Sequence, residues 1–223
     1  RLWKNKLSIL VGDYLFSKAL TNMAEIDSMD AVQILANLAS RLSQGEILQI
    51  EKALSKNINE EIYFKMISDK TASLFSASCK LGAITATKDP KKIKALSQFG
   101  EFLGQAFQIK DDLFDIVGNI GNTGKPSGYD LKKNMLTLPL IYVLDSKSNL
   151  EKKIFKLNLK MMLRKNKFNK IKEMIINEGG IEYAESKLLE ISKKARQELE
   201  IFKDSELKEA LITVLEFNLI RNL

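Results

Sequence analysis

The sequence predicts an all-α protein that forms one helical domain, and three observations lead to this fold class. Its 223 residues include only three prolines and eleven glycines, so few positions interrupt regular structure. Most segments between them carry apolar side chains at intervals of three and four, which is the spacing of a helix face and not of a strand. No repeat of fixed period and no strand-rich block indicates a second domain.

The N-terminal half is expected to begin with three helices. The first covers residues 7–20 and is apolar on two faces, so we expect other helices to surround it. A second helix is expected near residues 28–51. Asn57 and Glu60 then form a predicted capping box that opens a helix over residues 59–87.

The next helix has clear signals at both ends. Asp89 is its predicted cap, Pro90 its first residue, and Gly118 its stop. Gly179 and Gly180 separate two later helices. The remaining helices are expected near residues 134–146, 181–202 and 206–220.

Composition excludes several classes of protein and of chemistry. The chain is 45% hydrophobic and 28% charged, with no uncharged apolar run of membrane-spanning length and no signal-peptide pattern, so we expect a soluble, cytoplasmic protein. Cys79 is the one cysteine and cannot form an internal disulfide. Because histidine is absent, zinc sites and Ser-His or Cys-His pairs are excluded, which leaves carboxylates, lysines and a hard metal ion.

The formal charge of +7 would suit an acidic partner such as nucleic acid, but its distribution argues otherwise. Basic residues concentrate in residues 147–173, where glutamates and apolar residues interrupt them and no nucleic-acid module accompanies them. We interpret this segment as a solvated helix face or loop.

Acidic residues gather at the end of the helix that begins at Pro90. Gln108, Asp111 and Asp115 follow one another at intervals of three and four and share a face, while Asp112 lies about 100° away. Carboxylates at this end oppose the helix dipole, which costs about 0.3–1 kcal/mol each. They are either a solvated helix end or ligands of a cation, and their apolar surroundings favour the cation.

The donor set predicts a hard ion and a phosphate partner. Oxygen ligands alone favour Mg²⁺, which is bound by one or two carboxylates, water and substrate phosphates. Lys125, in the glycine-rich stretch that follows, could meet the remaining phosphate oxygens, although a lone loop lysine is more often solvated.

A second segment, residues 69–83, combines a cation with a strip of apolar and small residues. Lys70, with Thr71 beside it, heads a helix face that continues through Leu74 and Ala77. This pattern suits a ligand with a charged head and a hydrocarbon tail, or else ordinary helix packing with a surface lysine. The small residues Ser73, Ala77 and Ser78 would leave room for a long tail.

Seven segments together resemble the trans-type polyprenyl diphosphate synthases in order and approximate spacing. The "FQ..DD..D" element of residues 107–115 followed by "GK..G.D" is the most specific of them. The segments are LSILVGDYLFSKAL, GEILQI, DKTASLFSASCKLGA, FQIKDDLFD, TGKPSGYDL, TLPLIYVL and GGIEYAE.

The resemblance implies a helical bundle around a deep hydrophobic cavity with aspartates at its mouth. It identifies Asp111, Asp112 and Asp115 with the family's second aspartate-rich motif, which holds Mg²⁺ against an allylic diphosphate. Residues implied to contact that diphosphate are Lys70, Thr71, Gln108 and Lys125.

The function implied is condensation of isopentenyl diphosphate with an allylic diphosphate to give a medium or long trans-polyprenyl diphosphate. We also expect a homodimer, no integral membrane span, and transient membrane contact during product release. The alternatives are a non-catalytic partner subunit of a prenyl synthase and a terpene cyclase.

Two departures from the family pattern affect the site. The first aspartate-rich motif, its arginine pair and the isopentenyl diphosphate site would lie upstream of Arg1, so we expect a domain that is incomplete on its N-terminal side. In addition, Met135 stands where the family usually has a phosphate-binding lysine, which Lys132 or Lys133 could replace.

Overall fold

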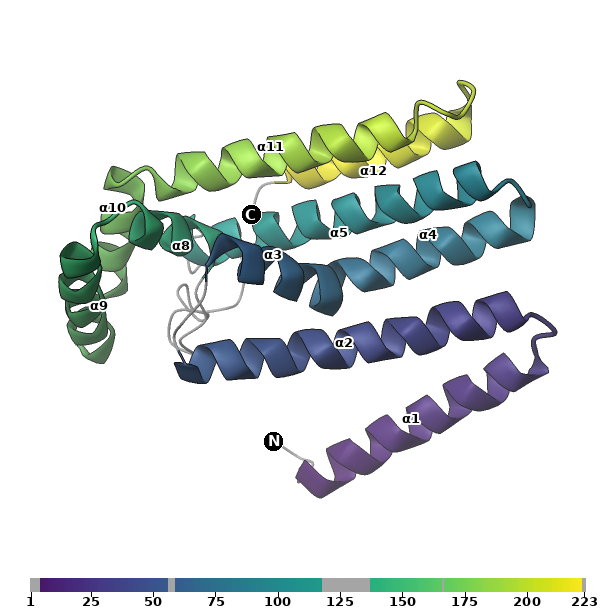
Figure 1. The fold of residues 1–223 in the computed structure, drawn as a ribbon, viewed down its shortest axis with the longest axis horizontal. Coiled ribbons are helices and arrows are strands. Elements are labelled where there is room, and N and C mark those ends of the chain that lie inside the picture. Colours follow the sequence, from purple (N-terminus) through teal and green to yellow (C-terminus); the bar gives the residue numbers. More distant parts are fainter. Residues whose placement is uncertain (1–4, 56–58, 118–136, 166, 222–223) are drawn as a thin grey trace.

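The computed structural model describes residues 5–55, 59–117, 137–165 and 167–221, and every regular element within these ranges is helical (Figure 1). The all-α prediction is therefore confirmed. A short π-helix, residues Ser68–Ala72, lies between α3 and α4. In chain order the α-helices are α1 (Asn5–Glu25), α2 (Met29–Ser55), α3 (Glu60–Ile67), α4 (Ser73–Ala86), α5 (Pro90–Val117), α8 (Leu138–Asp145), α9 (Asn149–Arg164), α10 (Phe168–Asn177), α11 (Gly180–Glu198) and α12 (Glu206–Ile220).

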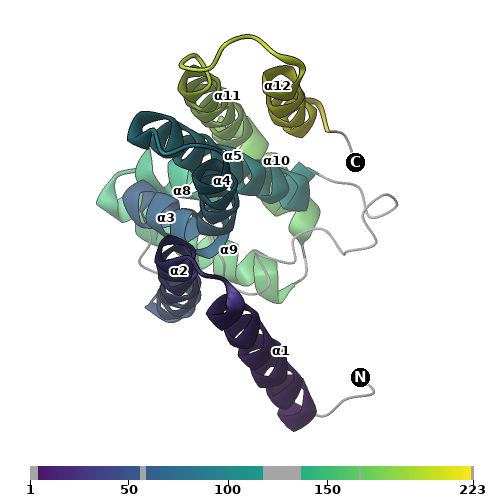
Figure 2. The ribbon, with the colours of Figure 1, turned by 90° about the vertical axis from the view of Figure 1, so that its right-hand side faces the viewer.

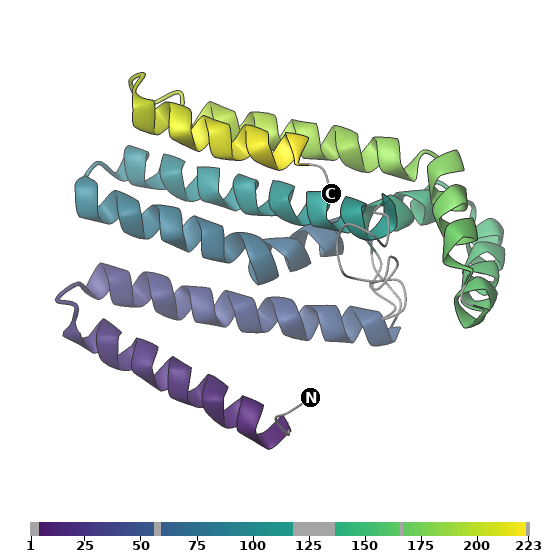
Figure 3. The same cartoon turned by 180° about the vertical axis from the view of Figure 1, so that it is seen from behind.

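The long helices lie side by side along the length of the molecule. α2, α4, α5 and α11 form successive layers, with α12 beside α11, as Figures 1 and 3 show. α9 and α10 lie together at one end of this bundle. Within the described ranges, no helix combines the length and hydrophobicity that a membrane crossing requires.

Three groups of buried apolar side chains hold these layers together, and α5 contributes to all of them. The first includes Tyr63 and Ile109 and joins α3, α5, α8 and α11. The second includes Ile116 and Phe155 and attaches α9 and α10 to the end of α5 and to α8. The third, around Phe99, joins α5 to α11 and α12. α5 is thus the central helix of the domain.

Capping residues explain where these helices begin. The Asp89 carboxylate accepts a hydrogen bond from the amide of Lys91 at 2.9 Å, so the predicted cap of α5 is confirmed. α3 is capped by Asn59, whose side chain accepts from the amide of Ile62, and not by the predicted capping box with Asn57, which lies outside the described residues. Gly179 adopts a left-handed φ of 76° and forms the predicted break before α11.

The prediction that residues 7–20 are surrounded by other helices is wrong for the described part of the chain. α1 lies at the edge of the bundle beside α2, and Figure 2 shows it projecting from the other helices. Apolar side chains on both of its faces are exposed, among them Leu10, Leu15 and Phe16. Apolar periodicity indicated that these faces should be covered, but it cannot say which chain covers them.

The π-helix interrupts what the sequence predicted as one continuous helix over residues 59–87. The amide of Ser73 donates to the carbonyl of Ser68, five residues back, which places one extra residue in the turn. Such insertions are frequent at functional sites. They rotate the side chains that follow, so periodicity of 3.6 residues no longer describes which residues share a face.

Two glycines allow α2 and α5 to approach this π-helix closely from two sides. A Cβ at Gly45 of α2 would lie 2.5 Å from the backbone nitrogen of Lys70. A Cβ at Gly104 of α5 would lie 2.5 Å from the Cα of Ala72. Since real Cβ atoms essentially never approach so closely, any larger residue would push the π-helix away from its neighbours.

We predict that Gly45→Ala lowers the free energy of unfolding by about 1–3 kcal/mol, because the added methyl group meets backbone atoms that cannot move aside. Gly82→Ala is the matched control, since a Cβ there meets nothing within 4 Å and should stabilise α4 by up to about 1 kcal/mol. Urea unfolding of both variants measures the difference. Equal stability of Gly45→Ala and the wild type would show that the fit is looser than described.

Candidate functional site

The predicted site residues come from two elements that the fold brings into contact. Lys70 and Thr71 belong to the π-helix, and the predicted amide and acids lie on the last turns of α5. The Thr71 hydroxyl donates to Oε1 of Gln108 at 2.8 Å, which joins the two elements directly. Lys125, Lys132, Lys133 and Met135 lie outside the described residues.

A chain of hydrogen bonds continues from Gln108 into the core. The Gln108 amide donates to Asp112 at 2.8 Å, and the hydroxyl of Tyr63 donates to the other Asp112 oxygen at 2.7 Å. Asp112 is only 5% exposed, and these donors compensate the loss of water around its carboxylate. Asp112 therefore supports Gln108 from the core side, and its role as a metal ligand stays a prediction.

Asp111 has a different environment from its neighbour. Its carboxylate is half-buried and pairs with the guanidinium of Arg221, at the end of α12. The same guanidinium lies over the rings of Phe107 and Phe114, 4.7 and 5.0 Å from their centres. Nε of Arg221 is buried and makes no hydrogen bond to any described residue.

Lys70 turns away from Thr71 and towards α2. Its ammonium group pairs with Glu46 at 3.0 Å and donates to Gln49. Two adjacent residues of the π-helix therefore reach opposite neighbouring helices. The candidate site is therefore formed by the π-helix together with the two helices on either side of it, α2 and the end of α5.

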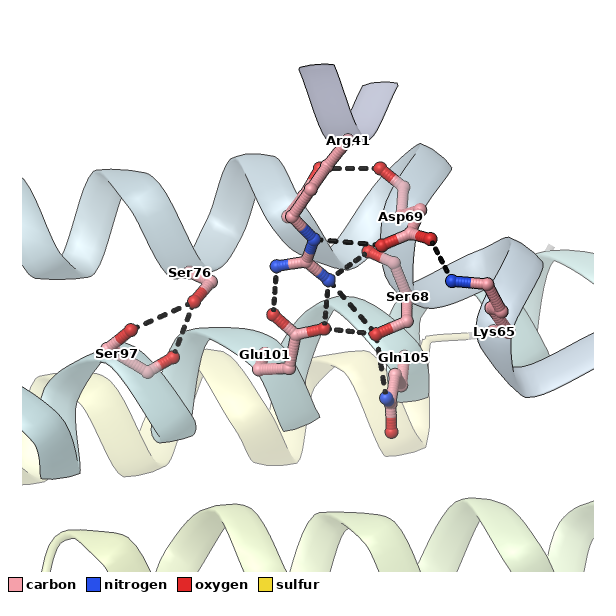
Figure 4. Close-up of polar contacts among 9 residues, drawn as sticks. Arg41, Lys65, Ser68, Asp69, Ser76, Ser97, Glu101 and Gln105 are labelled. Carbon is pink, nitrogen blue, oxygen red and sulfur yellow. Dashed lines mark hydrogen bonds and ion pairs between the residues drawn. The ribbon is translucent and has the colours of Figure 1, made fainter. Parts of the chain in front are cut away.

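Arg41 of α2 holds the first turn of the π-helix in place (Figure 4). Its guanidinium forms two hydrogen bonds with Glu101 of α5, at 3.0 and 2.7 Å. It also donates to the Asp69 carboxylate at 2.9 Å, and to both the carbonyl and the hydroxyl of Ser68 at 3.1 Å. One cation thereby joins α2, α5 and the residues that precede Lys70.

The environment of Arg41 keeps it charged. Its hydrogen bond with Glu101 is the largest cause that raises the pKa of the guanidinium above its usual range, and burial works in the opposite direction. Lys65 adds a second cation, 3.2 Å from Asp69. The buried carboxylate of Asp69 and the half-buried carboxylate of Glu101 are thus balanced by two cations, which limits the cost of removing them from water.

Sequence reasoning missed the residues that support the predicted ones. These are Arg41, Glu46, Tyr63, Glu101 and Arg221. Only Glu101 gave a weak indication in the sequence. It stands between residues that the apolar pattern assigns to the core, and a charged side chain there needs a partner of opposite charge. Nothing in the sequence identifies that partner as a residue 60 positions away.

The small residues below Lys70 do not form one wall. Ser73 and Ala77 are buried and line a pocket of about 130 Å³ that also contains Arg41 and Lys80. Ser78, like Leu74, is exposed. The predicted single strip is therefore wrong, because the π-helix and the packing of α4 on α2 and α5 divide these residues between different faces.

The described residues contain no group of three acidic, histidine or cysteine side chains placed to hold a metal ion. Asp111 and Asp115 offer two carboxylates one helical turn apart at the end of α5, and both are half-buried. This donor set suits a hard ion that takes its other ligands from water and a phosphate-bearing ligand.

Comparison with known proteins gives a consistent result. Residues 1–177 match the family model described as polyprenyl synthetase. The chain is 39% identical to heptaprenyl diphosphate synthase component 2 of Geobacillus stearothermophilus over 142 residues, which cover 64% of this chain and 44% of that protein. It is 29% identical to octaprenyl diphosphate synthase of Haemophilus influenzae, over 98% of this chain and 66% of that protein.

Solved structures show the same fold. A decaprenyl diphosphate synthase from Rhodobacter capsulatus superimposes with a TM-score of 0.88 at 31% identity, over 99% of this chain and 69% of that one. A polyprenyl synthase from Caulobacter crescentus, described as complexed with calcium and isoprenyl diphosphate, gives 0.87 at 31% identity, over 99% and 67%. The chain spans roughly two thirds or less of the length of the first curated relatives it matches.

We predict that Arg41→Gln lowers the free energy of unfolding by about 2–4 kcal/mol, because it leaves the half-buried Glu101 and the buried Asp69 without their main cation. Arg196→Gln removes an exposed pair with Glu216 and should cost less than about 1 kcal/mol. Chemical denaturation of both variants checks this difference. Arg41→Gln with wild-type stability would mean that water replaces the guanidinium without loss.

Proposed function

The chain belongs to the polyprenyl synthetase family, and we propose that the protein condenses isopentenyl diphosphate with an allylic diphosphate. The observation that carries this proposal is the contact between Thr71 and Gln108. It places a hydroxyl of the π-helix beside the acidic end of α5, while Lys70 of the same π-helix faces α2. This arrangement provides donors and cations for a diphosphate head next to carboxylates that suit a divalent ion.

Several residues would bind the diphosphate. Thr71 would face its oxygens, with Gln108 oriented by Asp112, and Lys70 would turn from Glu46 of α2 towards them. The guanidinium of Arg221, which pairs with Asp111, offers a further donor. Lys125 is expected to add another cation from the loop that follows α5. Each charge-assisted hydrogen bond of this kind contributes about 1.5–3 kcal/mol.

Asp111 and Asp115 would hold Mg²⁺, with Asp112 as a further candidate. Their hard oxygen donors fit this ion, and the relative from Caulobacter crescentus is described with both a divalent ion and an isoprenyl diphosphate. When bound, the ion supplies positive charge against the departing diphosphate. Arg221 now occupies part of this space on Asp111, so it would turn towards a phosphate oxygen when the ion binds.

The residues of this chain act by binding and by stabilising charge, and no protein nucleophile is required. The bond between the allylic carbon and the diphosphate oxygen breaks, and the diphosphate leaves with the electron pair. The double bond of isopentenyl diphosphate attacks the allylic carbon, and the new cation loses a proton to the departing diphosphate. Lys70 and the other donors stabilise the negative charge that grows on the leaving group.

We propose a medium or long prenyl chain as the product. The relatives with the names heptaprenyl and octaprenyl diphosphate synthase support this class, whereas a relative of 32% identity is named a short chain isoprenyl diphosphate synthase. Chromatography of dephosphorylated products from the intact protein decides between these lengths. Only cyclised hydrocarbon among the products would instead indicate a terpene cyclase.

We also propose a cytoplasmic homodimer. α1 exposes Leu10, Leu15 and Phe16 beside α2, and an apolar surface of this kind is typical of subunit contacts. The name "component 2" of one relative supports the alternative, a subunit that requires a different partner. Sedimentation of the intact protein distinguishes the two: a dimer with synthase activity supports the first, and an inactive monomer the second.

We predict that Asp111→Asn reduces Mg²⁺-dependent turnover by about 10²–10³-fold. Loss of the half-exposed pair with Arg221 should change the unfolding free energy by less than about 1 kcal/mol. Asp204→Asn, an exposed aspartate that pairs with Lys208, is the control and should keep full activity. Titration calorimetry of Mg²⁺ with inorganic pyrophosphate gives a second measurement, and wild-type binding by Asp111→Asn would contradict the metal assignment.

A further inference from the structure

The positive charge of this chain is concentrated in one segment. Residues 147–173 contain 10 lysines and arginines and 2 glutamates. The rest of the chain contains 25 basic and 26 acidic residues and is close to neutral. The segment forms α9 and most of α10, at one end of the bundle (Figure 1). The positive charge is therefore local to that end, and whether it serves solvation or an acidic partner depends on the surface around it.

α9 carries apolar side chains on two opposite faces. Phe155 and Leu159 are buried against the bundle. On the outer face, four large apolar side chains follow one another at intervals of four, three and four residues, so they form one stripe. This outer stripe consists of Leu150, Ile154, Leu157 and Met161, which are 70%, 51%, 62% and 53% exposed.

Lysines border the outer stripe. Lys153, Lys156 and Lys160 are exposed, and they form no ion pair with any residue in the described ranges. Lys152 differs, since it pairs with Asp145 at 3.0 Å. The one glutamate of α9, Glu151, caps the helix together with Ser148 and therefore does not neutralise these lysines.

The outer stripe lies at the end of the bundle that carries the candidate site. Ile116, at the end of α5, shares a core cluster with Phe155 and Leu159 of α9. The ammonium group of Lys172, on α10, donates to the carbonyl of Val117 at 2.7 Å. Whatever binds this surface would therefore lie near the acidic end of α5.

We propose that α9 docks on an anionic lipid bilayer, with the outer stripe in the acyl boundary and Lys153, Lys156 and Lys160 against lipid phosphates. A helix with exposed apolar side chains flanked by lysines binds membranes in this way. The biological purpose, delivery of a prenyl product to the membrane, rests on the proposed function. The docking itself depends only on the surface.

Other partners fit this surface less well. A nucleic acid would set four exposed apolar side chains against phosphates. A second copy of the chain that used the same surface would bring a second set of these lysines into the interface, and this accumulation of like charge is unfavourable. A lipid bilayer satisfies both the apolar stripe and the lysines.

The test measures co-sedimentation of the intact protein with phosphatidylcholine vesicles, with and without phosphatidylglycerol, in the absence of substrate. We expect binding only to the anionic vesicles and weaker binding at high salt. Lys153→Gln, Lys156→Gln and Lys160→Gln together should reduce the partition coefficient by about a hundredfold, at roughly fivefold per lysine. Ile154→Ser with Leu157→Ser should reduce it by at least about tenfold.

Matched controls remove the same groups elsewhere. The exposed lysines Lys88, Lys91 and Lys94 belong to the connection between α4 and α5 and to the start of α5, and Figure 1 shows this connection at the end of the bundle opposite α9. Their replacement by Gln removes equal charge and should leave binding unchanged. Leu189→Ser with Leu207→Ser removes two exposed apolar side chains from α11 and α12 and should also have no effect.

Three outcomes would overturn the proposal. The first is that the wild type does not bind anionic vesicles. The second is that the lysine controls lose as much vesicle binding as the triple lysine variant of α9. The third is that the stripe variant changes its oligomeric state while the wild type does not bind vesicles. Synthase activity is measured separately in vesicle-free solution, where the lysine variant should match the wild type. Vesicle binding without any synthase activity would reject the proposed function and leave the docking surface intact.

Discussion

The close approach of three backbones determines the geometry of the candidate site. The π-helix lies between α2 and α5, and glycines at the two points of contact bring its backbone nearer than any side chain would allow. This fit decides where Lys70 and Thr71 point. The extra residue in the turn directs Lys70 to Glu46 of α2 and Thr71 to Gln108 of α5. Helix packing is thus responsible for placing the polar groups.

Charge balance maintains this packing. Arg41 satisfies a carboxylate on α5 and another on the π-helix, so neither is buried without a cation. Such networks contribute little net stability, because the free energy needed to remove the charges from water is nearly as large as the free energy gained from their attraction. The network instead fixes the geometry, since the planar guanidinium of Arg41 forms good hydrogen bonds only when α2, α5 and the π-helix are correctly placed. The more exposed pair of Asp111 and Arg221 can rearrange at lower cost, which suits groups that must accept a ligand.

Two exposed apolar surfaces differ in their charge and hence in their partners. α1 contains two basic and two acidic residues among its apolar side chains, a balance compatible with a protein contact. α9 instead borders its outer stripe with lysines that form no ion pair with any residue of the described ranges, which suits a lipid surface. In both helices the apolar residues on the outer face are compatible with the helical pattern of the sequence, so the sequence does not mark them as exposed. Their exposure is visible only when the neighbouring helices are in place.

Local patterns in the sequence were enough to determine the helical class, the start of α5 at Asp89 and Pro90, and the break at Gly179 before α11. These features depend on residues within a few turns of one another, where helix geometry converts spacing into position. The tertiary structure alone decided that Asp112 faces Tyr63, that Arg41 joins Glu101, and that a π-turn redirects Lys70. Each of these depends on partners far apart in the chain, brought together by the packing of α2, α3 and α5, and periodicity within one helix carries no information about such partners.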